Sequence, residues 1–261
     1  MTKFRCNVWA ILLAGAPIFA QSPDPPAAPG SAPAGQEREV SWKKIFPNFL
    51  DDQKHIWLFP SQVVRGYHLV PTAAVLGLAA GMTVADPVEG RYFRANSETY
   101  HSFNQVFTGT TTTAEIFAVP VAFYLVGLAR KDSYAEHTAL LSLQAVADVE
   151  IPNVILRTVT RRLRPADVPI NGNFSDTWFD AGTNPLKAKG SFASGHAASA
   201  FAVATVVARR YSHRRWVPYV AYGTAGLLTF SRISTGAHFL SDTLFGSAMG
   251  YAAGRFVVLR Q

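Results

Sequence analysis

From about residue 42 onward, apolar segments are separated by Gly, Pro and polar clusters, without any convincing run of alternating apolar and polar positions. Alternation would indicate strands, so the pattern favours helices. The pattern predicts helices over about 42–57, 61–84, 112–130, 133–162, 194–211, 214–231 and 236–258. Pro152 should kink the fourth helix, because proline lacks an amide hydrogen and crowds the preceding turn. Residues 164–192 are too rich in Pro, Gly, Asn and Asp for regular structure. We expect an all-α fold, a helical bundle.

The first 41 residues differ in composition from the rest of the chain. Lys3 and Arg5 precede a short apolar stretch and a region suited to cleavage before Gln21, an arrangement typical of a signal peptide. The apolar stretch is shorter than the roughly 20 residues that span a bilayer, so an uncleaved anchor is the weaker alternative. The residues that follow are rich in Pro, Ala and Gly, which predicts a disordered linker. The expected organisation is a signal peptide at 1–20, a linker at 21–41 and one domain at 42–261.

Two long stretches without formal charge raise the question of membrane insertion. Residues 66–85 contain His68, Pro71 and several Gly and Thr, and residues 190–208 contain several Ser and His196. Helices of this kind suit the buried core of a bundle about as well as they suit lipid. We therefore expect an exported domain in the periplasm or at the periplasmic face of the inner membrane, in preference to a polytopic membrane protein.

Charge and cysteine content narrow the function only slightly. The formal net charge is +7, an excess that suits anionic substrates or an acidic membrane surface. The single cysteine, Cys6, lies within the expected signal peptide, so the mature domain should have neither a disulfide nor thiol chemistry.

A first candidate segment, RTVTRRLRP at 157–165, is rich in arginine. Arg157 and Arg164 are seven residues apart, so on one helix they would point to nearly the same side, two turns from each other. Arg161 would share that side, while Arg162 would point away. Two guanidinium groups on one face suit a tetrahedral oxyanion, because each can grip it with paired N–H donors. Taken alone, such a segment is more often a solvated basic face or a nucleic-acid patch.

A second segment, GSFASGHAAS at 190–199, is a Gly/Ser loop that leads into a helix of small residues. A helix start exposes unpaired N–H groups and a partial positive charge, which suits phosphate. Gly195 lacks the side chain that would keep an anion from this backbone. His196 would stand at the rim, where a proton donor is needed. Ser194-Gly195-His196 alone is a weak signal, since a capping histidine is commoner.

A third segment, SRISTGAHFLSD at 231–242, combines a histidine with a carboxylate. His238 and Asp242 are four residues apart on an expected helix, so their side chains should meet. A carboxylate that accepts from one imidazole nitrogen leaves the other nitrogen free to attack. Arg232 would add a third guanidinium. A metal site is the rival interpretation, but one His and one Asp make too few ligands.

Taken in order, the three segments resemble the signature of the superfamily of type 2 phosphatidic acid phosphatases and vanadium-dependent haloperoxidases. That signature is a basic residue, six residues and Arg-Pro; then Pro-Ser-Gly-His; then Ser-Arg, five residues, His, three residues and Asp. All these spacings hold between residues 157 and 242. Two residues depart from it. Arg157 stands where the family usually has Lys, and Ala193 stands where it has Pro, which removes stiffness from the loop.

The resemblance implies a metal-independent phosphatase with a two-step mechanism and no cofactor. His238, oriented by Asp242, would attack phosphorus and form a phosphohistidine, and His196 would act as general acid and then as general base. The phosphate would be held by five groups: Arg157, Arg164, the Ser194 hydroxyl, the Gly195 N–H and Arg232. Substrates would be lipid phosphates or small phosphomonoesters.

Three other functions stay open at this stage. A vanadium-dependent haloperoxidase would hold vanadate in the same pocket, with His238 as its ligand. A non-catalytic envelope protein could keep a vestigial anion pocket, although the retention of all the site residues argues against decay. Nucleic-acid binding would rest on Arg161, Arg162 and the basic cluster at 209–215, which reads more simply as a solvated or membrane-facing turn. We therefore expect no nucleic-acid partner.

The sequence separates neither a lipid from a soluble substrate nor one oligomeric state from another. Several aromatic residues before the arginine segment could line an acyl-chain groove, and core packing explains them equally well. They are Trp57, Phe59, Tyr92, Phe93, Phe103 and Phe107.

Overall fold

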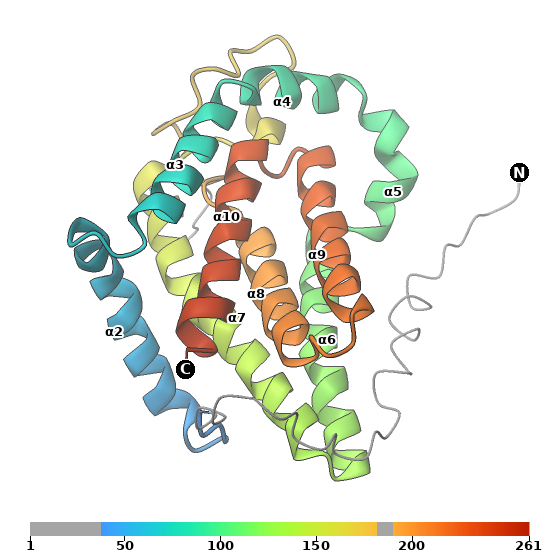
Figure 1. The fold of residues 1–261 in the computed structure, drawn as a ribbon. Helices are drawn as coiled ribbons and strands as arrows, with labels where there is room; N and C mark the ends of the chain where they lie inside the picture. The colour runs from blue at the N-terminus through green and yellow to red at the C-terminus, as the bar shows by residue number, and fades with distance from the viewer. Residues whose placement is uncertain (1–37, 182–189, 261) are drawn as a thin grey trace, which may run out of the picture.

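The structure, a computed structural model, describes residues 38–181 and 190–260, and within these residues it contains helices and no strand (Figure 1). The all-α prediction is therefore confirmed. The α-helices are α2 (Ile45–Val64), α3 (Leu69–Thr83), α4 (Asp86–Ala95), α5 (His101–Val106), α6 (Gly109–Arg130), α7 (Ser133–Thr160), α8 (Gly195–Arg210), α9 (Trp216–Ser234) and α10 (Leu240–Ala252). Short 3₁₀ turns occupy Ser97–Tyr100 and Pro165–Asp167, and a π-helical turn, Ala253–Val258, follows α10.

Helix α8 lies at the centre of the bundle and packs against α6, α7, α9 and α10 (Figure 1). Its sequence, GHAASAFAVATVVARR, is rich in small residues, most of which are buried. Close approach of α10 also depends on small residues. A side chain at Gly246 would collide with the Ser194 carbonyl, and one at Gly250 would collide with the Ala198 carbonyl. These contacts hold the second half of α10 against the start of α8, where the second candidate segment lies.

Helices α6 and α7 form a hairpin beside α8. Lys131 adopts the left-handed conformation at the end of α6, and the Asp132 side chain accepts from the backbone N–H groups of Tyr134 and Ala135 at the start of α7. The hairpin returns the chain, so the end of α7 lies near the start of α6. The hydrophobic core between these helices and α8 and α9 includes Ile116, Phe123, Ala139, Val203 and Leu228.

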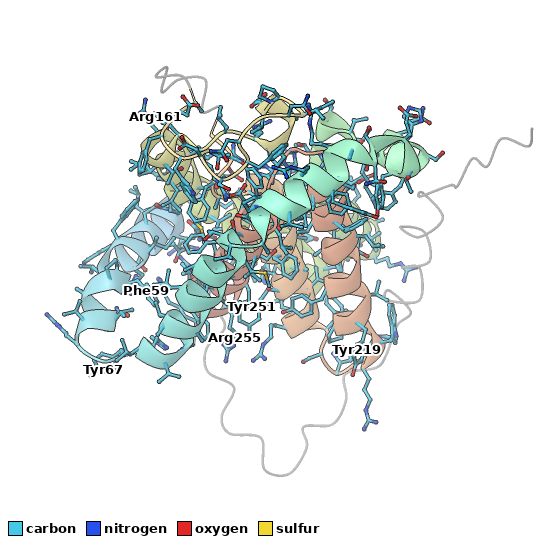
Figure 2. All side chains as sticks on the ribbon, turned by 90° about the horizontal axis from the view of Figure 1, so that it is seen from above. Phe59, Tyr67, Arg161, Tyr219, Tyr251 and Arg255 are labelled. Atoms are coloured by element: carbon cyan, nitrogen blue, oxygen red, sulfur yellow. The ribbon has the colours of Figure 1, made fainter. Side chains whose placement is uncertain are left out.

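The helix expected at 61–84 is broken in the structure. Gly66 and His68 both have positive φ, at 91° and 55°, and α2 and α3 meet at 98°. Two helices were not predicted, α4 and α5. With α3 they form an arc over one end of the bundle, which Figure 2 shows from above. Helix α7 continues through Pro152 to Thr160.

Two helices, α6 and an α7 segment extended to Asp167, are long and apolar enough to cross a membrane; counting the bent pair α2–α3 as one span would give three. These helices differ from the two uncharged stretches that the sequence analysis considered for membrane insertion. Residues 66–85 contain the bend at His68, and residues 190–208 form most of the buried helix α8. Helices α6 and α7 carry stripes of exposed apolar residues, Phe117, Val121, Leu125 and Leu128 on the first and Ile151, Val154, Ile155 and Val159 on the second.

The expected signal peptide and most of the expected linker lie outside the described residues. Of the linker, residues 38–41 are described: the Arg38 guanidinium pairs with Asp52 at 2.8 Å and Val40 is buried.

Candidate active site

His238 is buried where the chain passes from α9 to α10. Gly236 adopts a positive φ of 68°, and the His238 N–H donates to the Arg232 carbonyl, so a tight turn ends directly before the histidine. Only 1% of the residue is exposed. Its Nδ1 lies 2.7 Å from the Ser191 carbonyl oxygen. Because a carbonyl only accepts, Nδ1 carries the hydrogen and Nε2 keeps a free lone pair.

The role expected of Asp242 requires a correction. Its Oδ2 lies 4.0 Å from His238 Nδ1, too far for a hydrogen bond. The reason is that α10 begins at Leu240, so His238 precedes the helix and is not on a common helical face with Asp242. Asp242 Oδ2 instead accepts from the Ser191 hydroxyl at 2.5 Å and from the Phe239 N–H at 2.8 Å. It therefore holds Ser191, whose carbonyl holds the imidazole.

Arg162 is buried, although the sequence pattern placed it on the far side. Its guanidinium donates to Asp242 and to Asp86, each at 2.6 Å, and lies between the rings of Trp178 and Phe239. The helical pattern failed because α7 ends at Thr160 and Arg161 turns left-handed, with φ of 41°. Arg161 itself lies at the outer edge of the bundle (Figure 2).

Asp86 ties α4 to this buried network. Its carboxylate accepts from the Ser241 N–H at 3.1 Å and from the Ser241 hydroxyl at 2.5 Å, so it also caps the start of α10. Burial, followed by the charge of Asp86, raises the pKa of nearby Glu89 to about 8. Glu89 is therefore mostly protonated at neutral pH and adds little negative charge beside Asp86 and Asp242.

Arg157 and Arg164 approach the same place, but from two different elements. Arg157 is in the last turn of α7 and donates to the Ala193 carbonyl at 3.2 Å. Arg164 is in an extended segment after the helix, so the expectation that both stand on one helix is wrong. Burial, and then the positive charges of Arg157 and Arg164, hold the pKa of His238 well below its usual value. His238 is therefore a neutral imidazole at physiological pH.

The start of α8 supplies the third part of the site. The Ser194 side chain accepts from the Ala197 N–H at 3.4 Å, and the Ser194 N–H donates to the Asp242 carbonyl at 3.1 Å. A Cβ on Gly195 would stand 2.5 Å from Arg157 Nη2 and 2.6 Å from Asn153 Nδ2. Glycine at this position is thus what allows Arg157 to approach the helix start.

His196 occupies the rim of the site. Its Nε2 lies 3.2 Å from the Gly109 carbonyl oxygen and 3.1 Å from the Thr113 hydroxyl, and its buried Nδ1 has no hydrogen-bond partner among the described residues. Burial, followed by the charges of Arg232 and Arg157, lowers the pKa of His196 to about 4. Arg232, from α9, is itself buried and donates to the Phe107 carbonyl. His196 is therefore neutral while the site holds no anion.

A pocket of ≈ 260 Å³ adjoins His196 between α6, α7 and α8. It is lined by Thr113, Ile116, Phe117, Val146, Glu150, Arg157, Gly195, His196 and Ser199. Sequence reasoning missed Glu150 and Ser199, because nothing in the local pattern marks two polar residues on neighbouring helices as partners. In the described part of the chain, no group of three or more His, Cys, Asp or Glu is placed to hold a metal ion.

Residues 133–261 match the family described as the PAP2 superfamily, and this range contains all three candidate segments. The chain belongs to the PAP2 superfamily. A lipid A 1-phosphatase from Porphyromonas gingivalis is 40% identical over 68 residues, which are 26% of this chain and 15% of that protein. The match thus spans only a small part of this curated relative.

Among solved structures, the PAP2 chain is similar to a transmembrane PAP2-type phosphatidylglycerolphosphate phosphatase from Bacillus subtilis. The TM-score is 0.41 and the sequence identity is 18%, over 82% of this chain and 92% of the other.

Proposed function

We propose that this PAP2 protein is a phosphoric monoester hydrolase that acts on lipid phosphates at a membrane surface through a phosphohistidine on His238. The observation that carries the proposal is the environment of His238. A buried neutral imidazole is held by Nδ1 on the Ser191 carbonyl, and the charges of two arginines act on it. Membership of the PAP2 superfamily and the local similarity to a lipid A 1-phosphatase support it.

In the first step, the lone pair on His238 Nε2 attacks phosphorus, and the bond from phosphorus to the ester oxygen breaks. Arg157, Arg164 and Arg232 neutralise the charge on the phosphoryl oxygens, with the Gly195 N–H as a further donor. These guanidinium groups supply the electrostatic stabilisation that a metal ion provides in other phosphatases. The Ser191 carbonyl accepts the Nδ1 hydrogen throughout and so stabilises the phosphorylated ring.

His196 moves the protons in both steps. In the first it gives a proton to the leaving alkoxide, and in the second it takes one from the water that attacks the phosphohistidine, after which inorganic phosphate leaves. The negative charge of the bound phosphate opposes the effect of Arg232 and Arg157 on His196 and raises its pKa, so the proton enters together with the substrate.

The surface of the bundle supports a lipid substrate. The exposed apolar stripes on α6 and α7 suit contact with acyl chains, and both helices are long enough to span a bilayer. Thr113 is near the start of α6 and Arg157 near the end of α7, so the site would lie at one end of both spans. A phosphate headgroup would reach it there without leaving the membrane surface. The periplasmic face stays a prediction.

The test is hydrolysis of an aryl phosphate and of a long-chain phosphatidate by the purified protein in chelator, with His238→Ala as the comparison. We expect chelator-resistant release of phosphate that is lost in the variant. A phosphohistidine is stable in base and labile in acid. Labelled phosphate should therefore be trapped as a base-stable adduct on the wild-type protein. Retained turnover in His238→Ala, with the helical content unchanged, would exclude His238 as the nucleophile.

A further inference from the structure

The pocket beside His196 lies on the side of the site from which the alcohol should leave. In-line transfer puts the attacking atom and the departing oxygen on opposite sides of phosphorus. Under the proposed function His238 is the nucleophile, and it is not among the pocket residues, whereas the general acid His196 is. The volume of ≈ 260 Å³ is large enough for part of a lipid next to the phosphate.

The pocket changes in character along its length. Arg157 and Val146 are eleven residues apart on α7, which is about 16 Å along a helix. Glu150 lies between them, and the wall opposite is formed by Ile116 and Phe117 of α6. A ligand that extends from the phosphate site would therefore meet a carboxylate first and apolar side chains afterwards.

Glu150 is placed to accept hydrogen bonds from such a ligand. The position of a Gly195 Cβ would be 2.5 Å from Arg157 Nη2 and 3.3 Å from Glu150 Oε1, so both groups border the same small space. The carboxylate already accepts from the Ser199 hydroxyl at 2.8 Å and from Asn153 Nδ2 at 3.3 Å. A carboxylate has about four acceptor sites, so about two remain. A negative charge here disfavours a second phosphate and favours a donor.

The apolar end of the pocket continues onto the outside of the bundle. Phe117 lines the pocket and is also 40% exposed, as the first member of the stripe on α6. An acyl chain could therefore pass from the pocket to the apolar surface without crossing a polar barrier.

From this arrangement we infer that the pocket binds the leaving alcohol, and that Glu150 selects lipid phosphates whose alcohol carries a hydroxyl or amide donor close to the phosphate ester. The inference rests on the proposed function and deepens it. Lipid phosphates without such a donor would leave the remaining acceptor sites of the Glu150 carboxylate facing carbon, which costs affinity in the transition state.

A matched pair of substrates tests this selectivity. One is 1-oleoyl-glycerol 3-phosphate, which has a free hydroxyl beside the phosphate-bearing carbon. The other is its 2-deoxy analogue, which differs only in lacking that hydroxyl. In mixed micelles, we expect kcat/KM of the wild-type protein to favour the hydroxylated substrate by about tenfold or more. Glu150→Ala should reduce this preference to about twofold or less, mainly by slowing the hydroxylated substrate.

Further variants separate selectivity from structure. Glu150→Gln keeps the shape and one acceptor oxygen, so it should retain part of the preference. Glu98→Ala, at an exposed glutamate of the arc, should leave the preference unchanged.

Each other outcome has a definite meaning. Equal losses on both substrates in Glu150→Ala would show that Glu150 only supports the fold of the site, and would overturn the inference. Equal rates on the two substrates in the wild-type protein would overturn it as well, while leaving the proposed phosphatase intact. Failure of the wild-type protein to hydrolyse either substrate or an aryl phosphate would instead reject the proposed function.

Discussion

The two histidines of the site lie in unlike surroundings. His238 is fixed from several sides: Ser191 holds its ring, Asp242 holds Ser191, and Arg162 holds Asp242. His196 has looser contacts, at 3.1 and 3.2 Å, and one of its nitrogens has no partner among the described residues. We call His238 with Ser191, Asp242 and Arg162 the closed region, because these residues form a connected network. We call His196 the open region, because it borders a pocket.

This contrast corresponds to the different tasks proposed for the two residues. A nucleophile gains from being held in one orientation, because the geometry of attack is narrow. A general acid and base must change its protonation state twice in a cycle and must face alcohols of different shape. The closed region should therefore control whether the reaction occurs at all, and the open region should control which substrates react.

The largest effect should come from the histidines themselves. His238→Ala should lower kcat/KM on the order of 10⁴-fold or more for every substrate, because no other group can form the intermediate.

His196→Ala should lower kcat/KM about 10²- to 10⁴-fold for alkyl phosphates but less than about tenfold for activated aryl phosphates, which need no proton on the leaving group. Rates with aryl phosphates of graded leaving-group pKa measure this difference, and equal losses on all of them would contradict the role of His196.

The next largest effect should come from opening the closed region at Arg162. Arg162→Leu leaves Asp86 and Asp242 buried without their cation, so the free energy of unfolding should fall by about 3–5 kcal/mol. Arg162→Lys keeps the charge but loses the forked guanidinium that reaches both carboxylates. Its free energy of unfolding should therefore lie between those of the wild-type protein and of Arg162→Leu. Chemical unfolding in detergent micelles measures these values. Arg65→Leu, at an exposed arginine directly after α2, should change the free energy of unfolding by less than about 0.5 kcal/mol.

Activity separates a positioning role of Arg162 from a purely structural one. In the folded fraction of Arg162→Lys, kcat should fall at nearly unchanged KM, because the imidazole is misoriented while the phosphate groups remain. A stability loss without any change in kcat would show that Arg162 serves the fold alone.

A smaller effect is expected where the two regions meet, at Gly195. Gly195→Ala places a methyl group against Arg157 and Asn153, so the guanidinium must withdraw from the phosphate site. We expect KM for an aryl phosphate to rise by about tenfold to thirtyfold. Gly223→Ala is the matched control, since this helical glycine has nothing within 4 Å of an added Cβ. Similar kinetics in the two variants would refute the role given to Gly195.

The sequence predicted the fold class, and it marked residues that the fold brings close together, although their roles stay predictions. Helices α6 to α10 coincide with long apolar segments, and the site residues stand at fixed spacings that are visible in one dimension. The two missed helices, DPVEGRYFRA and HSFNQV, are short and more polar than these segments. For α4 a signal was present, since Pro87 lies in the first turn and Asp86 and Glu89 are acidic residues near its start.

The connections between the site residues could not be predicted in the same way. The orientation of Arg162 depended on where α7 ends, and the left-handed Arg161 has no marker in the sequence. Its partner Asp86 is 76 residues away, on α4, a short polar helix that the sequence analysis did not predict. Ser191 acts through its backbone carbonyl, which every residue possesses. Partners of this kind become visible only when the chain is folded.

A pH dependence of similar size to the Gly195 effect belongs to His196. Its pKa is about 4 in the folded protein and about 6.5 when unfolded, so between these values the unfolded chain binds more protons. Stability should therefore fall as the pH is lowered from 7 to 5, by about 2 kcal/mol from this residue. His238 shifts in the same direction, so the closed region should add to the slope.

His196→Asn isolates the contribution of the open region. The variant keeps a polar side chain of similar reach but cannot titrate, so its free energy of unfolding should change less between pH 7 and pH 5 than that of the wild-type protein. Inorganic phosphate should reduce the wild-type slope as well, because the bound anion offsets the charges of Arg232 and Arg157 and lets His196 take up a proton in the folded state. An unchanged slope in the variant would mean that the imidazole of His196 meets solvent freely, and that the arginines do not act on it as the geometry requires.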